Sequence, residues 1–299
     1  MSYQIIDGKA TSLKVQEEIA AEVESRVRSG GKRPHLAAVL IGDDPASKAY
    51  VGHKVKACNN VGFESSLVER ESDITEEEVL KIVDNLNNDD SIDGFIVQLP
   101  LPSHINPVKV IEAVSPVKDV DGFHPVNVGK MSLGLPTFKP ATPAGVMTLL
   151  EHHGIKTEGL HAVVIGRSDI VGNPMSALLR SNTEPGNCTV TQCHSRTNDL
   201  KSHTLQADLL ITAIGKPHFI TADMVKEGAV VIDVGITRVE DSTNSRGYVL
   251  KGDVAYNEVE PKASYITPVP GGVGRMTIAA LLQNTLQARQ NRIKPLLNK

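Results

Sequence analysis

The sequence has few of the features that mark secreted, membrane-bound or nucleic-acid-binding proteins. Its 299 residues include only three cysteines, and this small, odd number indicates reduced thiols rather than a disulfide framework. No uninterrupted apolar run approaches the roughly 20 residues that span a bilayer. The N-terminal residues MSYQIIDGKA also lack the basic and apolar segments of a secretion signal. We therefore expect a cytoplasmic protein that does not contact a membrane.

An excess of positive charge is absent as well. The 31 Lys and Arg residues are outnumbered by 35 Asp and Glu residues, the formal net charge is −4, and no basic stripe runs along the chain. This composition argues against a nucleic-acid partner and favours small-molecule ligands. The chain is long enough for two domains, and its apolar content of 40% suffices for a core in each.

The first half of the chain alternates buried strands with amphipathic helices. Helical periodicity predicts helices over 13–29, 46–62, 79–87 and 107–114, while apolar runs predict strands over 35–42 and 94–102. Such alternation is typical of an open, mostly parallel α/β layer. Ligands of such layers lie beyond the C-terminal ends of the strands.

The predicted helix over 46–62 carries a tyrosine and a lysine on one face. Asp44 is a suitable N-cap, and Pro45 suits the first helical position. Tyr50 and Lys54 are four residues apart, so a phenol and an amine lie side by side on a rigid element. A surface pair whose lysine reaches into solvent is the simplest interpretation, and a functional pair is the alternative.

Further polar side chains follow the predicted strand over 94–102. Gln98 lies at its end, in a loop that prolines stiffen, although a glutamine facing water would also fit. Asp119 and Asp121 lie in a turn-rich segment, where aspartates usually cap their own backbone. No histidine or cysteine cluster accompanies them, so we expect no metal site.

The second half begins after a stretch without periodicity. Glycines and prolines over 129–143 predict a domain boundary there. We expect one domain to comprise residues 1–141 and the C-terminal helix 276–299, and the other to comprise residues 142–275. In the second domain, apolar strands that end in glycine alternate with helices, including one predicted over 221–227, and the segment 239–248 is predicted to be a loop or hairpin. This pattern indicates a small doubly wound sheet.

A glycine-containing turn opens the first strand-to-helix connection of that domain. Gly166 and Gly172 allow close backbone approach, and the N-terminus of the helix that follows can accept a phosphate, although a tight turn without a ligand has the same pattern. After the next strand come Ser195 and Arg196, at the place where NAD-specific domains tend to carry an acid. This favours a 2′-phosphate and hence NADP over NAD, unless Arg196 is only a surface arginine.

Seven segments, in a fixed order, resemble one family. They read DDPASKAYVGHK, DGFIVQLPLPSH, KDVDGFHPVNVG, FKPATPAGV, GRSDIVGNP, CHSRT and ITPVPGGVGRMT. Over nearly the whole chain they are similar to the bifunctional methylenetetrahydrofolate dehydrogenase/cyclohydrolase family of the FolD type. Two positions depart from the family pattern, because Arg275 stands where proline is usual and Ala141 where cysteine is frequent. We hypothesise that Arg275 contacts a phosphate or a folate carboxylate.

The resemblance implies a two-domain α/β fold and a pair of reactions. An N-terminal folate-binding catalytic domain and a Rossmann-like NADP-binding domain are expected to enclose a cleft. The implied reactions are NADP-dependent oxidation of 5,10-methylenetetrahydrofolate to the 5,10-methenyl compound and its hydrolysis to 10-formyltetrahydrofolate. The implied assembly is a homodimer paired through the second domain.

The resemblance also implies site residues. The catalytic ones are Tyr50, Lys54, Gln98 and Asp121, which bind the substrate together with Leu99, Pro270 and Gly271. The implied NADP-binding residues are Gly166, Arg167, Ser168, Gly172, Ser195, Arg196, Gly215, Ile236 and Gly274. In chemical terms, we expect Lys54 to move a proton during hydrolysis, Gln98 to orient its amine, Tyr50 to stack on the substrate and Asp121 to accept hydrogen bonds from the pterin.

Three other interpretations stay open. Tyr50-x-x-x-Lys54 matches the acid pair of short-chain dehydrogenases, although there the pair follows the glycine loop within one Rossmann domain. A non-catalytic nucleotide sensor would keep the same fold, because a fold alone does not establish activity. A member of the same family that retains only one of the two activities is the third possibility.

Overall fold

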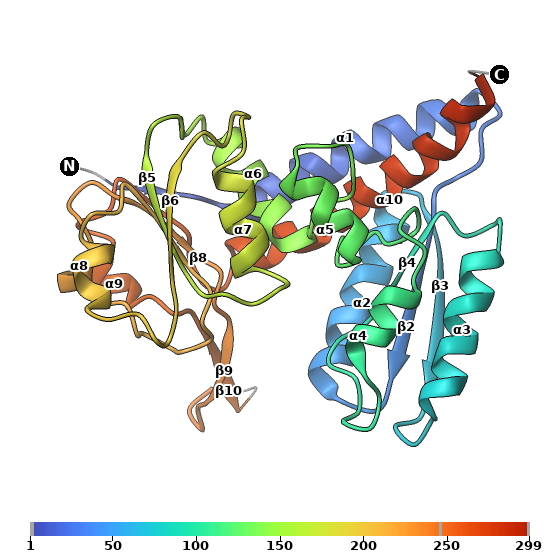
Figure 1. Cartoon of the computed structure of the whole chain (residues 1–299), viewed down its shortest axis with the longest axis horizontal. Coiled ribbons are helices and arrows are strands. Elements are labelled where there is room, and N and C mark those ends of the chain that lie inside the picture. The colour runs from blue at the N-terminus through green and yellow to red at the C-terminus, as the bar shows by residue number, and fades with distance from the viewer. Residues whose placement is uncertain (1–2, 245–246, 298–299) are drawn as a thin grey trace. The chain divides into compact units, whose positions relative to one another are not determined.

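The computed structural model describes residues 3–244 and 247–297, and the chain divides into two compact units (Figure 1). We call them the three-stranded unit, which comprises residues 13–131, 135–141 and 278–299, and the six-stranded unit, which comprises residues 1–12, 132–134 and 142–277. The long helices α1 (Gly8–Arg28) and α10 (Val273–Leu297) are among the elements that contribute residues to both. Residues 298–299, at the end of the predicted C-terminal segment, lie outside the described part.

The three-stranded unit is built on a parallel sheet of order β3-β2-β4. Its elements after α1 are β2 (His35–Ile41), α2 (Pro45–Asn60), β3 (Glu64–Arg70), α3 (Glu76–Asn88), β4 (Gly94–Val97), α4 (Pro107–Ala113) and α5 (Pro125–Ser132). The central strand β2 packs Ala37, Val39 and Ile41 against α3 and α4 in a buried apolar core. The predicted α/β layer is thus confirmed for this unit.

Local sequence signals account for the helix boundaries here. Asp44 caps α2 by accepting a hydrogen bond from the Ser47 N–H at 2.8 Å, and Pro45 occupies the first turn. Gly62, just beyond the helix end, adopts a φ of +76°, which favours glycine. Thr75 and Glu78 form a reciprocal capping box at the start of α3. The start of α2 at Asp44 and Pro45 is the one that the sequence predicts.

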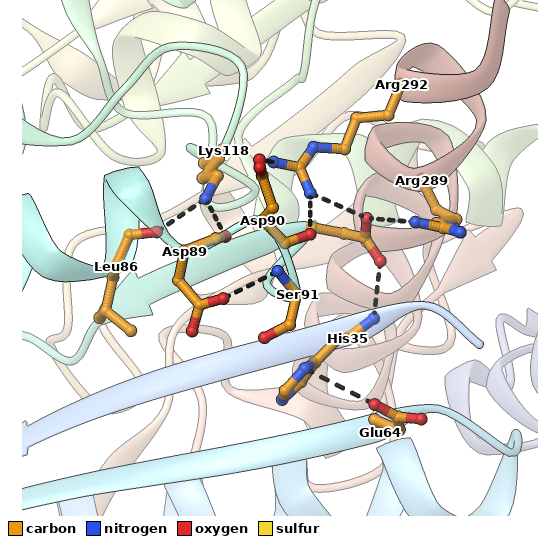
Figure 2. Close-up of polar contacts among 10 residues, drawn as sticks. His35, Glu64, Leu86, Asp89, Asp90, Ser91, Lys118, Arg289 and Arg292 are labelled. Atoms are coloured by element: carbon orange, nitrogen blue, oxygen red, sulfur yellow. Dashed lines mark hydrogen bonds and ion pairs between the residues drawn. The ribbon is translucent and has the colours of Figure 1, made fainter. Parts of the chain in front are cut away.

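The C-terminal half of α10 is fixed to the three-stranded unit by buried polar contacts. Asn284 donates hydrogen bonds to the carbonyl oxygens of Val120 (2.8 Å) and Lys139 (2.9 Å). Arg289 and Arg292 then meet the carboxylate of Asp93 at 3.4 and 3.6 Å (Figure 2). Because Asp93 is 1% exposed and also accepts the His35 N–H, its charge is compensated within the protein.

The six-stranded unit contains a parallel sheet of order β1-β11-β8-β7-β5-β6 and a separate hairpin. The strands of the sheet are β1 (Gln4–Ile5), β5 (His161–Ile165), β6 (Thr189–Cys193), β7 (Leu209–Thr212), β8 (Val230–Asp233) and β11 (Tyr265–Ile266). The helices are α6 (Ala141–His152), α7 (Gly172–Leu179), α8 (Leu200–Thr204) and α9 (Tyr256–Val259), and the hairpin is formed by β9 (Thr237–Glu240) and β10 (Tyr248–Lys251). The doubly wound character predicted for this part is confirmed.

Two segments of this unit differ from expectation or refine it. The predicted helix over 221–227 is wrong, because only the single 3-10 turn η1 (Ala222–Met224) forms. The Thr221 side chain provides no cap, and Val225 is already extended and fully buried in the core. The segment 239–248 forms the β9–β10 hairpin, one of the two predicted alternatives, with residues 245–246 outside the described part.

Candidate active site

Lys54 points into the three-stranded unit rather than into solvent. It lies on α2 and is 5% exposed, and its Nζ is 5.1 Å from the centre of the Tyr50 ring. The Nζ donates a 3.0 Å hydrogen bond to Gln98 Oε1. The interpretation of a surface pair with a solvated lysine is therefore wrong.

Gln98 presents its oxygen to the amine because its other atoms are already engaged. It follows β4, and its backbone N–H donates to the Val39 carbonyl oxygen at 2.9 Å, which extends the sheet contact by one residue. Its side-chain Nε2 donates to the Leu99 carbonyl oxygen at 2.6 Å. The ammonium group of Lys54 only donates hydrogen bonds and therefore needs the amide oxygen, while the Leu99 carbonyl only accepts and needs the amide nitrogen. Both contacts thus require the same orientation of the Gln98 amide. Gln98 thus holds Lys54 without adding charge.

The two aspartates of the turn after α4 have different environments. Asp119 accepts hydrogen bonds from the N–H groups of Gly122, Phe123 and His124 and from the Asn127 side chain. Asp119 therefore has the backbone-capping role that is usual for turn aspartates. Asp121 makes none of these contacts, and both aspartates line a small cavity together with Leu99 and Phe123.

Burial shifts the acid–base properties of the site in opposite directions. It lowers the pKa of the Lys54 amine, and the nearby carboxylate of Asp121 opposes that shift. It raises the pKa of Asp121 to about 6, against the favourable charge of Lys54. Burial also raises the pKa of the Cys58 thiol, one helical turn after Lys54, to about 12. Burial thus brings the pKa values of the Lys54 amine and the Asp121 carboxyl group closer together, whereas the Cys58 thiol stays neutral.

In the six-stranded unit, the predicted phosphate turn follows β5. Gly166 has a φ of +131°, and Ser168 Oγ accepts the N–H groups of Val171 (3.2 Å) and Gly172 (3.3 Å) at the start of α7. A Cβ on Gly172 would lie 2.4 Å from the Gly166 carbonyl oxygen. Gly172 is therefore required by the packing of the turn itself, and Arg167 and Ser168 remain exposed at its surface.

The other predicted cofactor residues lie in loops of the same unit. Ser195 and Arg196 are exposed after β6, and the Arg196 side chain makes no ion pair with any residue that the structure describes. Gly215 (φ +64°) follows β7, Ile236 (54% exposed) follows β8, and Gly274 is exposed in the first turn of α10. Pro270 and Gly271 precede α10 in the loop after β11.

Sequence analysis missed a second pair of carboxylates. Asp253, after β10, is 0% exposed and accepts hydrogen bonds from the backbone N–H groups of Ile214 and Lys216, on both sides of Gly215. Asp233, at the end of β8, binds the backbone around Asp253. The only signal in the sequence is an aspartate at a strand end.

Two family models match the chain, one in each half. The catalytic domain of tetrahydrofolate dehydrogenase/cyclohydrolase matches residues 6–121, and the NAD(P)-binding domain of the same family matches residues 140–293. The chain belongs to the tetrahydrofolate dehydrogenase/cyclohydrolase family. The family predicted from the seven segments is confirmed.

Individual family members are similar over almost their whole length. The bifunctional protein FolD of Cytophaga hutchinsonii is 62% identical over 285 residues, covering 95% of this chain and 98% of that protein. A crystal structure of the bifunctional enzyme FolD from Campylobacter jejuni is 47% identical, with a TM-score of 0.91 over 97% of this chain and all (100%) of that one. The structure of FolD from Trypanosoma brucei, complexed with NADP cofactor and an inhibitor, is 37% identical with a TM-score of 0.92 over 98% of this chain and 99% of that one.

Membership of the tetrahydrofolate dehydrogenase/cyclohydrolase family excludes the short-chain dehydrogenase interpretation. Tyr50 and Lys54 lie in the three-stranded unit, and the Gly166 turn lies in the six-stranded unit.

This family member departs from the expected pattern at two positions. Ala141 is buried at the start of α6, and Arg275 is exposed in the first turn of α10. Among the residues described, no cluster able to hold a metal ion and no helix able to cross a membrane is found.

Proposed function

We propose that this chain oxidises 5,10-methylenetetrahydrofolate with NADP+, hydrolyses the resulting 5,10-methenyl compound to 10-formyltetrahydrofolate, and uses Lys54, Gln98, Tyr50 and Asp121 for these reactions. The observation that supports this most strongly is the buried Lys54 amine, whose pKa is lowered by burial and whose Nζ is 3.0 Å from Gln98 Oε1. A desolvated amine of this kind is suited to accept and return a proton.

The oxidation step needs mainly alignment. Hydride leaves the carbon that bridges two folate nitrogens, and the cation that results is delocalised onto both nitrogens. Little acid or base assistance is required, so the contribution of the protein is to hold this carbon against the nicotinamide ring. The Tyr50 ring, packed beside Lys54, offers a flat surface for stacking of the substrate.

The hydrolysis step needs a proton to move twice. Water adds to the methenyl carbon and loses a proton, then one carbon–nitrogen bond breaks and the departing nitrogen gains a proton. Neutral Lys54 accepts the first proton and, as an ammonium group, can supply the second. Gln98 keeps the amine in place in both states because an amide oxygen accepts hydrogen bonds from either form.

Asp121 is assigned to substrate binding. A carboxylate accepts two parallel hydrogen bonds from the adjacent amino and ring N–H donors of a pterin. The N–H groups of the turn donate to the carboxylate of Asp119, so they do not occupy the carboxylate oxygens of Asp121. Leu99 lines the same cavity as Asp121, and we assign Leu99, Pro270 and Gly271 to further contacts with the folate.

The six-stranded unit is assigned to NADP. Arg196 is exposed after β6 and has no ion-pair partner among the described residues, which leaves its guanidinium available for a 2′-phosphate. Gly166, Arg167, Ser168 and Gly172 are assigned to the pyrophosphate. Ser195, Gly215, Ile236 and Gly274 complete the proposed set.

We further propose that the chain acts in the cytoplasm as a homodimer paired through the six-stranded unit. We also keep the proposed folate-binding domain at residues 1–141 and 276–299 and the NADP-binding domain at 142–275. Light scattering at working concentration is expected to give the mass of a dimer, and a monomer under those conditions would contradict the pairing.

The proposed activity is tested with purified protein, 5,10-methylenetetrahydrofolate and either NADP+ or NAD+, while reduced nucleotide, methenyl and 10-formyl products are followed separately. We expect reduced nucleotide and formyl product with little methenyl accumulation, and faster turnover with NADP+. Accumulating methenyl product would indicate a dehydrogenase without effective hydrolysis. No turnover by folded protein would favour a nucleotide sensor.

A further inference from the structure

The loop after β7 is fixed by hydrogen bonds from its backbone to a buried carboxylate. Asp253 accepts 2.7 Å hydrogen bonds from the N–H groups of Ile214 and Lys216. These two residues flank Gly215, which is exposed and has a φ of +64°. With both neighbours directed inward, the Gly215 N–H itself has no hydrogen-bond partner among the described residues. Asp253 therefore fixes a loop whose central donor is free.

The loop after β8 is linked to the backbone of Asp253 through the Asp233 side chain. One oxygen of Asp233 accepts the N–H groups of Gly235 and Asp253 at 3.0 Å each, and the other accepts the Val254 N–H at 2.9 Å. The Thr212 hydroxyl donates to the same carboxylate at 3.2 Å. The contacts of Asp233 thus set the position of the Asp253 backbone, from which the Asp253 side chain reaches the loop after β7.

The two carboxylates occupy space that side chains would otherwise fill. A Cβ added to Gly235 would lie 2.2 Å from the Asp253 carboxyl carbon, and one added to Gly252 would lie 2.0 Å from an Asp233 oxygen. Ile236 follows Gly235 and is exposed. Its backbone N–H has no hydrogen-bond partner among the described residues. Both loops therefore present a free backbone donor.

Simple packing does not explain why this place holds two acids. Asp233 and Asp253 are 3% and 0% exposed, and placing like charges together in the interior costs free energy. The cost is met by five backbone N–H groups, all from the segments that follow β7, β8 and β10. Loops at the C-terminal ends of parallel strands are where ligands of such sheets bind. The carboxylates thus stabilise one conformation of ligand-facing loops.

We infer that Asp253, held in place by Asp233, is a positioning residue for the nicotinamide cofactor, and that it acts by directing the N–H groups of Gly215 and Ile236 outward to acceptor atoms of that cofactor. This inference rests on the proposed function, in which the six-stranded unit binds NADP. Neither carboxylate touches the cofactor, because both are covered by the loops they hold.

The test is Asp253→Asn. An asparagine offers one acceptor oxygen, and its NH2 group would face the second backbone N–H, so the loop around Gly215 loses a charge-assisted hydrogen bond and gains a repulsive contact. We expect the KM and the Kd for NADP+ to rise about tenfold or more. The KM for the folate and the rate of methenyl hydrolysis, which consumes no nucleotide, should stay within about twofold of the parent.

Asp208→Asn is the matched control. Asp208 immediately precedes β7, at the opposite end of the strand from the Gly215 loop, and it also accepts a backbone N–H, from His161 at 2.9 Å. This variant should lose stability without a change in NADP+ binding. Thr212→Val, which removes one donor to Asp233 at nearly constant volume, should raise the Kd for NADP+ about threefold and provides the test if Asp253→Asn does not fold.

The outcomes separate this inference from the proposed function. An unchanged Kd for NADP+ in folded Asp253→Asn protein, or an equal rise in Asp208→Asn, would overturn the positioning role. If Asp253→Asn does not fold, an unchanged Kd in Thr212→Val would do the same. Failure of the parent protein to turn over folate would instead count against the proposed function. NADP+ binding by calorimetry needs no turnover, so it judges the inference in either case.

Discussion

Replacing Lys54 by methionine is expected to separate the two proposed reactions. Methionine fills a similar volume with a flexible apolar chain but carries no amine. Hydrolysis then loses the group that accepts the proton of water, and general acid–base catalysis of this kind contributes about 10²–10⁴-fold to a rate. Oxidation keeps Tyr50 and Asp121 for alignment, so we expect its kcat to fall by no more than about tenfold.

The same substitution has a predictable effect on stability. Burial lowers the pKa of Lys54 below the value of about 10.4 that an unfolded chain would show, so between these two values the unfolded state binds more protons. The parent therefore gains stability relative to Lys54→Met as the pH rises toward about 10, by about 1.4 kcal/mol for each unit of pKa depression. Loss of the donor to Gln98 Oε1 costs the variant about 1 kcal/mol at every pH.

Lys118→Met is the control for removal of a buried amine. Lys118 lies in the same unit, is 2% exposed, and has a pKa that burial also lowers. Its Nζ donates to the carbonyl oxygens of Leu86 and Asp89 at the end of α3 (Figure 2). The Lys118 carbonyl oxygen still accepts the Phe95 N–H after the substitution, so the backbone there stays in place.

The assay compares parent, Lys54→Met and Lys118→Met in methenyl hydrolysis and in NADP+ reduction, together with chemical denaturation at neutral and alkaline pH. We expect Lys118→Met to be less stable than the parent and to keep both kcat values within about twofold. Full cyclohydrolase activity in Lys54→Met, or an equal loss in Lys118→Met, would refute the assignment of Lys54.

Four further substitutions or treatments test other parts of the protein. Arg196→Ala should raise the KM for NADP+ about tenfold and leave that for NAD+ unchanged, and an equal rise for both would refute a contact with the 2′-phosphate. Asp121→Ala should raise the Kd for folate, measured by calorimetry, about tenfold or more, and an unchanged Kd would contradict the assignment of Asp121 to folate binding. Asp93→Ala should cost about 3–5 kcal/mol in urea denaturation, because two arginines lose their buried partner, and a loss below about 1 kcal/mol would contradict this. The Cys58 thiol, whose pKa burial raises to about 12, should resist iodoacetamide at pH 8 until the protein unfolds.

Local signals allowed α1 to α4 to be predicted. The helix α5 (Pro125–Ser132) was missed, because its residues lie in a stretch of glycines and prolines that was interpreted as turns and a domain boundary. The cap at Asp44 and the stop at Gly62 define α2 within the chain segment itself. The edge strand β3 (Glu64–Arg70) was not predicted, because its residues are mostly polar and its strand character depends on pairing with β2. The short helices α8 and α9 likewise depend on tertiary packing.

The candidate site was predictable to the extent that its contacts follow from spacing. Tyr50 and Lys54 are close because they are one helical turn apart. The Lys54–Gln98 contact spans 44 residues and follows only from the placement of α2 beside the end of β4. Asp253 could not be predicted, because its partners are backbone N–H groups of a loop 37 and 39 residues earlier in the chain, and backbone groups leave no pattern in a sequence.

Lys54 and Lys118 show why residue type, burial and pKa together do not identify a catalytic group. Both amines are nearly inaccessible, and burial lowers the pKa of both. Lys118 donates to two carbonyl oxygens, and these contacts hold its amine at the end of α3. Lys54 donates one hydrogen bond to the described residues, to an uncharged amide, although an ammonium group has three donors. This unused hydrogen-bonding capacity is open to water and substrate, and it is the reason why we propose Lys54, and not Lys118, as the reactive lysine.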